Sequence, residues 1–305
     1  MSRLSPADPG GRPGIEAFSA LARAFPAEHP HVVDLPYRLG SWALDEPENC
    51  RLWLDGAGRL LAWGALQTPF WLIEYGCHPK ARSGLLDEIL GWGAERARQV
   101  AGTPYGRPSW FVEARPEDEE GRQALERAGF AAVPVSGSGS WSRVWMRAVE
   151  GPPDRVPPPG FAIRPLAGEV EAPLAVELQR SFFETSNMTL PWRLRLLRHP
   201  AYDPALDVVA VARGGRVAGL CLGWYDAPSG TGQVEPVGVL HEERGRGLGR
   251  AIVAECVRRL LRRGAREVLV EVDAGNAAAL ALYRSLGFRP FQDVVFHRRE
   301  PGGAA

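Results

Sequence analysis

The spacing of apolar and polar residues predicts the same succession of elements twice along this chain of 305 residues. The first half shows a strand pattern, a second apolar segment, a helical pattern, another strand pattern and another helical pattern, at 58–66, 70–79, 85–98, 109–115 and 120–130. The second half repeats this order at 215–224, 234–239, 249–264, 267–272 and 276–288. The copies lie 157 residues apart at Gly58 and Gly215, and 158 apart at Gly129 and Gly287. We therefore expect a mixed α/β (α+β) protein that contains two copies of one unit.

The helix expected at 249–264 has the clearest pattern. Ile252, Cys256 and Leu260 recur every four residues and form an apolar stripe along one side. Arginines occupy the remaining surface near its C-terminal end, where positive charge suits the helix dipole. Gly264 then provides a natural stop. We expect the apolar stripe to face a core and the arginines to face solvent.

A proline-rich segment separates the two copies. Residues 151–160 read GPPDRVPPPG, a composition that neither a helix nor a central strand would tolerate. We expect this segment to link a domain at 15–150 to a domain at 161–300. Residues 1–14, also rich in proline and glycine, are expected to form a flexible N-terminus.

Composition narrows the classes of function. Acidic and basic residues are equal in number, at 36 each, so net charge gives no reason to expect a nucleic acid or an anionic membrane as partner. No apolar run approaches the ~20 residues of a membrane span, and the N-terminus lacks the apolar core of a signal peptide. The four cysteines have no CxxC spacing, which favours buried free thiols over a metal site or disulfides. We expect a cytoplasmic monomer or homodimer without a metal.

A glycine-rich loop precedes the helix at 249–264. It reads Arg244-Gly245-Arg246-Gly247-Leu248-Gly249, and such a loop at a helix N-terminus can present backbone N–H groups to a phosphate. A dinucleotide fingerprint fails because Arg250 stands where its last glycine belongs, and a P-loop fails because the only lysine is Lys80. The loop matches Q/RxxGxG/A instead.

On this motif the chain resembles the GCN5-related N-acetyltransferases. The resemblance rests on VGVLHEERGRGLGRAIV at 237–253, on NAAALALYRSLGF at 276–288, and on the order of elements between them, over about residues 161–300. It implies a twisted mixed sheet flanked by helices, and acetyl-CoA as the acyl donor. Applied to both copies, it implies two tandem GNAT-like domains.

The resemblance also implies where acetyl-CoA would bind. In the family, the strand before the glycine loop parts from its neighbour and receives the pantetheine arm. Pro236 and Gly238, which are unusual in a central strand, suit a bulge at that place. The implied contacts are backbone groups of the strand, amides of the loop, and the side chains of Arg246 and Arg250, for which simple surface charge is the alternative. Asn276 is a further contact, although it could equally only cap a helix. They comprise Val237, Gly238, Val239, Arg244, Gly245, Arg246, Gly247, Leu248, Gly249, Arg250 and Asn276.

Two residues are candidates for proton transfer. An amine acceptor with a pKa of about 10.4 needs a base near neutral pH, and Glu235 lies on the strand that would face the thioester. The alternative is a carboxylate that points to solvent, since one step of register reverses its face. Tyr283 stands at the family position whose hydroxyl protonates the leaving sulfur, and the alternative is a tyrosine packed in the core. The Val239 amide is the expected donor to the thioester carbonyl.

The first copy lacks these motif residues. Leu85 stands where Gly247 belongs, Leu125 replaces Tyr283, and Glu74 matches Glu235 only with a slip of one residue. We therefore expect a degenerate N-terminal domain, structural or acceptor-binding, and a catalytic C-terminal domain. By resemblance, residues 182–202 form part of the acceptor wall, with Trp192 more suited to core packing.

These features together predict an acetyl-CoA-dependent N-acetyltransferase that acts by direct attack in a ternary complex. The acceptor would be a small-molecule amine or a protein N-terminus. The alternative is a non-catalytic acetyl-CoA-binding or interaction protein, because one copy has already lost the motif.

Overall fold

The computed structural model describes residues 13–26, 29, 31–135, 142–153 and 156–302. The chain divides into two compact units. Unit 1 comprises Met1–Arg143 together with Asp293–Ala305, and unit 2 comprises Val144–Gln292. The end of the chain therefore returns to the first unit.

Unit 1 contains a sheet in the order β1-β2-β3-β4-β12, with β5 beside β12. Its strands are β1 (Cys50–Leu54), β2 (Leu60–Gln67), β3 (Leu72–Cys77), β4 (Trp110–Ala114), β5 (Ala131–Ala132) and the end of β12 (Arg289–Arg299). Its helices are α1 (Pro13–Ala24), α2 (Leu35–Leu39), α3 (Arg82–Gln99) and α4 (Glu119–Arg127). Residues 295–299 of β12 pair antiparallel with 110–114 of β4.

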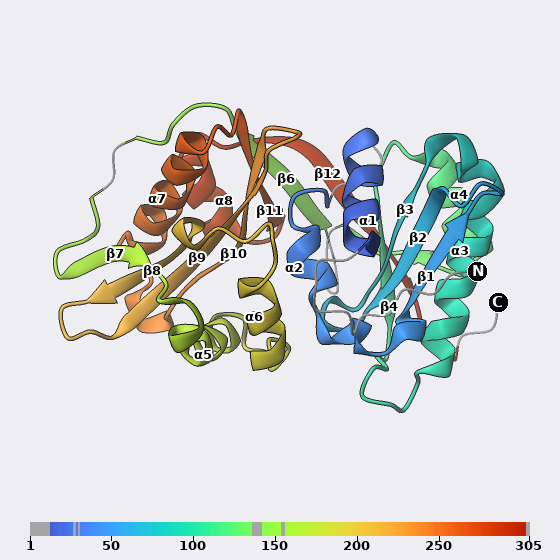
Figure 1. Ribbon diagram of the computed structural model, residues 1–305, viewed down its shortest axis with the longest axis horizontal. Coiled ribbons are helices and arrows are strands. Elements are labelled where there is room, and N and C mark those ends of the chain that lie inside the picture. The colour runs from blue at the N-terminus through green and yellow to red at the C-terminus, as the bar shows by residue number, and fades with distance from the viewer. Residues whose placement is uncertain (1–12, 27–28, 30, 136–141, 154–155, 303–305) are drawn as a thin grey trace. The chain divides into compact units, whose positions relative to one another are not determined.

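Unit 2 contains a sheet in the order β7-β8-β9-β10-β11-β6. Its strands are most of β6 (Ser142–Ala148), β7 (Phe161–Pro165), β8 (Asp207–Ala212), β9 (Val217–Asp226), β10 (Thr231–Val239) and β11 (Glu267–Asp273). Its helices are α5 (Ala172–Phe183), α6 (Leu190–Leu197), α7 (Leu248–Arg262) and α8 (Ala277–Arg284). Helices α7 and α8 cover one face of the sheet, and α5 and α6 cover the other (Figure 1).

The elements predicted from the apolar pattern are confirmed in type and order. The paired segments of the two copies form β2 and β9, β3 and β10, α3 and α7, β4 and β11, and α4 and α8. The mixed α/β fold class is therefore confirmed. The N-terminal prediction falls largely on residues outside the described ones, although α1 already begins at Pro13. Within 151–160, the residues that the structure describes form neither helix nor strand.

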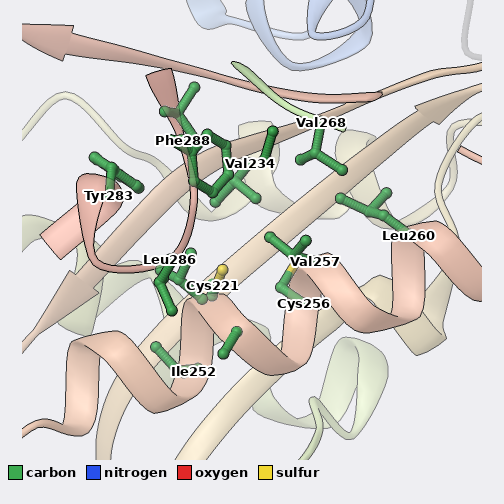
Figure 2. Packing of buried hydrophobic residues seen from close by; sticks show 14 of the residues in the cluster. Cys221, Val234, Ile252, Cys256, Val257, Leu260, Val268, Tyr283, Leu286 and Phe288 are labelled. Carbon is green, nitrogen blue, oxygen red and sulfur yellow. The ribbon is translucent and has the colours of Figure 1, made fainter. Parts of the chain in front are cut away.

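Helix α7 shows why the apolar pattern specifies the core of unit 2. Its buried side chains Ile252, Cys256 and Leu260 pack against β9 and β10, and Figure 2 shows this cluster with Phe288 and Val268. Gly223 and Gly232 lie beneath this helix, where an added Cβ would press on Cys256 or Leu260. The strand glycines therefore allow the helix to lie close to the sheet.

All four cysteines are free and buried, as the sequence predicts. Trp192 is also buried, with only 1% of its surface exposed, so its predicted role in core packing is confirmed. Among the described residues, no helix combines the length and the apolar character that a membrane span requires.

Candidate active site

Strand β10 carries the bulge that Pro236 and Gly238 predict. Val234 pairs with Gly223 and Val237 pairs with Cys221 on the antiparallel neighbour β9. Two residues of β10, Glu235 and Pro236, therefore stand opposite a single residue of β9. The indole Nε1 of buried Trp224 donates a hydrogen bond of 2.9 Å to the carbonyl oxygen of Glu235, which fixes the bulged backbone.

Beyond this bulge, β10 separates from its parallel neighbour. Residues 231–233 of β10 pair with 267–269 of β11, and the described strands have no further register between them. The sheet therefore contains a wedge between the second half of β10 and the end of β11. Gly238 also lets α5 pack on the other side, because a Cβ there would collide with the ring of Phe182.

The glycine loop has the backbone conformation that its sequence requires. Gly245 and Gly247 have φ of +76° and +84°, in the left-handed region that other residues avoid. An added Cβ at either position would meet nothing within 4 Å, so the space above the loop is open. Gly249 is needed for a different reason, because a Cβ there would lie 3.2 Å from Leu282 of α8.

Helix α7 begins directly at this loop without a side-chain cap. Gly247 is its N-cap residue, and no side chain accepts a hydrogen bond there. Leu248 is buried, so its side chain anchors the first turn in the core while the backbone N–H groups of this turn point out of the helix end. An uncapped helix start with open space above it is suited to bind an anion.

Arg250 adds a positive charge at the same end of α7. It lies in the first turn, where the helix dipole disfavours a cation. Its side chain has no ion-pair or hydrogen-bond partner among the described residues, and its Nε is buried. No described residue gives this half-buried guanidinium a compensating negative charge, so a bound anion would supply one.

The other two arginines of the loop have partners within unit 2. Arg246 forms an ion pair with Glu243 and lies over the ring of Phe161, with 5.4 Å between its Cζ and the ring centroid. Glu243 is buried and also binds Arg216. Arg244 donates through Nε to the carbonyl oxygen of Val239 at 3.4 Å. These contacts fix the shape of the loop, and the role of Glu243 was not predicted from the sequence.

Glu235 and Tyr283 are brought together from different elements. Glu235 is half-buried on the bulge of β10, and Tyr283 is buried on α8. Burial raises the pKa of Tyr283, and the nearby Cys221 and Glu235 raise it further. The carboxyl group of Glu235 therefore lies within electrostatic reach of the phenol, and the phenol stays protonated at neutral pH.

The ring of Tyr283 packs in the core, as the alternative interpretation required. It meets Phe288 edge to face with 5.5 Å between centroids, and Figure 2 shows both at the border of the cluster. Among the described residues, the hydroxyl has no hydrogen-bond partner. Core packing of the ring and chemistry at the hydroxyl are therefore compatible.

The remaining candidates lie on β10 and at the start of α8. Val237 and Val239 are partly buried on β10 and pack against the core of unit 2. Asn276 caps α8, because its Oδ1 accepts a hydrogen bond of 3.0 Å from the N–H of Ala279. The capping interpretation is thus confirmed, and the exposed amide nitrogen stays available to a ligand.

A buried ion pair that was not predicted from the sequence anchors α6 on the face of the sheet opposite α7 and α8. Arg193 of α6 binds Asp207 at the start of β8, and both are almost fully buried, at 1% and 0% exposed. The hydroxyl of Tyr202 donates to the same carboxylate at 2.8 Å. This cluster fixes α6 and the segment after it against the sheet.

Comparison with known proteins agrees with this fold. Residues 173–288 match the acetyltransferase (GNAT) family. The fold is similar to that of a GCN5-related N-acetyltransferase from Sphaerobacter thermophilus, with a TM-score of 0.65 and 24% identity over 99% of this chain and 96% of that one. It is also similar to a tandem GNAT protein from the clavulanic acid biosynthesis pathway, with a TM-score of 0.64 and 16% identity over 99% of this chain and 98% of that one. The chain therefore has a tandem GNAT fold.

Among curated proteins, the chain is similar to mycothiol acetyltransferases. That of Pseudarthrobacter chlorophenolicus is 27% identical over 237 residues, which are 74% of this chain and 69% of the relative. Alignments to three others span less than half of the relatives' own length, between 24% and 48%.

Proposed function

We propose that this protein is an acetyl-CoA-dependent N-acetyltransferase whose active site lies in unit 2. The observation that carries this proposal is the meeting of three features at one place. They are an uncapped glycine-rich helix start with an unpaired arginine, a parted sheet beside it, and a carboxyl group near a protonated phenol. The match of residues 173–288 to the GNAT family supports the same activity.

Successive parts of acetyl-CoA would contact successive residues along the wedge in unit 2. The N–H groups from Gly245 to Arg250 would hold the diphosphate, and the guanidinium of Arg250 would supply the opposing charge. Backbone groups of Val237 and Val239 would form hydrogen bonds with the amides of the pantetheine arm. The arm would enter where β10 no longer pairs with β11. The thioester carries the acetyl group and a good leaving group to the bulge at Glu235.

Glu235 would act as the base. An aliphatic amine with a pKa of about 10.4 is almost entirely protonated at neutral pH and cannot attack a thioester in that form. The half-buried carboxylate on the bulge would accept its proton, directly or through one water. The amine nitrogen then bonds to the acetyl carbon, and the Val239 amide would stabilise the charge on the carbonyl oxygen.

Tyr283 would complete the reaction. When the carbon–sulfur bond breaks, the departing thiolate takes a proton from the phenol of Tyr283, which burial keeps protonated by raising its pKa. The second proton of the amine nitrogen, lost as the amide forms, would restore the phenol. Direct transfer is favoured over an acyl-enzyme because Cys221, which lies beside the bulge, is fully buried and burial raises its pKa well above the usual value. Its thiol is therefore a poor nucleophile.

For the acceptor, we propose a small-molecule amine. The relatives named mycothiol acetyltransferases favour this class over a protein N-terminus. Residues 182–202, from the end of α5 through α6 to the segment after it, would form part of its wall, with Ser186 and Phe183 exposed there.

The test of this function is a thiol-release assay with acetyl-CoA over a library of small-molecule amines and N-terminal peptides. We expect release of one thiol per amide formed, with at least one small-molecule amine. Tight binding of acetyl-CoA without turnover across the library would favour the non-catalytic alternative. Turnover with peptides alone would reassign the acceptor class.

Replacement of Tyr283 by phenylalanine tests the proton donor. The ring keeps its contact with Phe288, so we expect an unchanged melting temperature and an unchanged Kd for acetyl-CoA. We expect kcat to fall by a factor on the order of 10²–10⁴, the usual contribution of a positioned acid. Full activity of the variant would mean that Tyr283 is a core residue only.

A further inference from the structure

The one-residue slip between the two copies has a structural cause. In unit 1, β3 pairs with β2 in unbroken register, with Glu74 opposite Ala65 and Gly76 opposite Trp63. In unit 2, the equivalent strand β10 has the bulge at Glu235 and Pro236. The extra residue of β10 is therefore the bulge, and β3 is a regular strand without one.

Strands β3 and β4 of unit 1 also part from each other, but side chains of the same unit bridge the opening. Among the described residues, their parallel register is a single pair, Leu72 with Phe111. Arg38 binds Glu74 on β3, and Nε2 of His31 lies 3.0 Å from a carboxylate oxygen of Glu113 on β4.

Asp34 joins the two cations of this bridge. Its carboxylate lies 3.2 Å from Nδ1 of His31 and 3.8 Å from Nη1 of Arg38. We call the set His31, Asp34, Arg38, Glu74 and Glu113 the internal latch. Each of the five side chains is at most 10% exposed.

The pair of His31 and Glu113 within the latch is charged at neutral pH. Burial and Arg38 oppose the charged form of His31, but Asp34 and Glu113 outweigh them and raise its pKa to about 10. Burial likewise opposes the charged form of Glu113, but His31 lowers its pKa to about 2. The contact between β4 and His31 thus stays an ion pair through the range in which the protein would work.

The start of helix α3 in unit 1 is also occupied by side chains of the same unit. Arg82 at the start of α3 binds Asp118, which is the N-cap of α4, and Tyr75 of β3 lies beside the same guanidinium. In unit 2, the corresponding helix starts are Gly247 and Asn276, with open space above Gly247. Where unit 2 leaves room for an anion, unit 1 already contains a paired carboxylate.

We propose that unit 1 is closed to acyl-CoA by its own side chains, so that the chain has one acyl-CoA site and that site is in unit 2. The internal latch takes the place of the pantetheine arm between β3 and β4, and the Arg82–Asp118 pair takes the place of the diphosphate. This inference rests on the proposed function for the identity of the ligand. It assigns unit 1 a fold that is complete without a cofactor.

The number of sites is measured on the full-length wild-type protein by equilibrium dialysis with radiolabelled acetyl-CoA, up to saturation. We expect one molecule bound per chain. Two molecules per chain would overturn the closure of unit 1. No binding at any concentration would instead contradict the proposed function, so the two failures can be told apart.

Hydrogen exchange with saturating acetyl-CoA locates the site without any substitution. We expect slower exchange in peptides that cover 237–253 and no change in peptides that cover 72–85. Protection of 72–85 without protection of 237–253 would place the single site in unit 1 and overturn the proposal. Protection of both segments would also overturn the proposal, because it would indicate a site in each unit.

Discussion

Replacement of Glu235 by glutamine is expected to lower kcat by a factor on the order of 10²–10⁴, because the amine would lose its proton acceptor while the shape of the side chain is kept. The Kd for acetyl-CoA should stay within about twofold of the wild-type value, since the diphosphate contacts lie at α7. The rate of the variant should rise more steeply with pH, as free amine becomes available from solution.

Glu255→Gln is the matched control for this experiment. Glu255 pairs with Arg258 and Arg259 on α7, away from the bulge of β10, so its loss should leave kcat and the pH profile unchanged. An unchanged pH profile and kcat in Glu235→Gln would remove this residue as the base, and the carboxylate would then be structural.

Replacement of Arg193 by methionine is expected to destabilise the protein strongly. The variant leaves the Asp207 carboxylate fully buried, with the Tyr202 hydroxyl as its one remaining side-chain donor among the described residues. Breaking a buried pair in this way costs about 3–5 kcal/mol in the free energy of unfolding. Urea unfolding followed by tryptophan fluorescence would measure it, because Trp192 is buried in the same helix.

Arg198→Met provides the comparison at the end of the same helix. Arg198 pairs with Glu169 at the surface, where both side chains are more than half exposed, and its loss should not change the unfolding midpoint measurably. Equal midpoints for the Arg193 and Arg198 variants would contradict the assigned importance of the buried pair.

The sequence could predict those parts of the site that depend on local signals. Three glycines before an amphipathic helix indicate left-handed turns and an anion-binding helix start, and the structure shows φ of +84° at Gly247. Pro236 and Gly238 within an apolar strand indicate a bulge, because neither residue suits a regular central strand. The bulge lies where those two residues predicted it.

The long-range contacts could not be predicted in the same way. His31 and Glu113 are 82 residues apart, and no periodicity in the chain indicates that they meet. The pairing of Arg246 with Glu243 is local, and the alternation of acidic and basic residues before Gly247 could have suggested it. Sheet membership of the last strand depends on pairing with β4, which lies far earlier in the chain, and an apolar pattern alone does not specify such a pairing.

The proposed function depends on binding of the acetyl-CoA diphosphate at the start of α7, and calorimetric titration of Gly247→Leu measures this binding. Leucine in this left-handed position costs about 1–2 kcal/mol of backbone strain, so the fold should survive. Its side chain would occupy the open space above the loop.

Gly168→Leu is the control, because Gly168 also has a positive φ and open space but lies before α5. We predict that acetyl-CoA binds to the wild type and to Gly168→Leu with equal Kd, and that Gly247→Leu gives no detectable heat of binding at the same concentrations. Undiminished binding to a folded Gly247→Leu protein would show that the start of α7 does not hold the diphosphate.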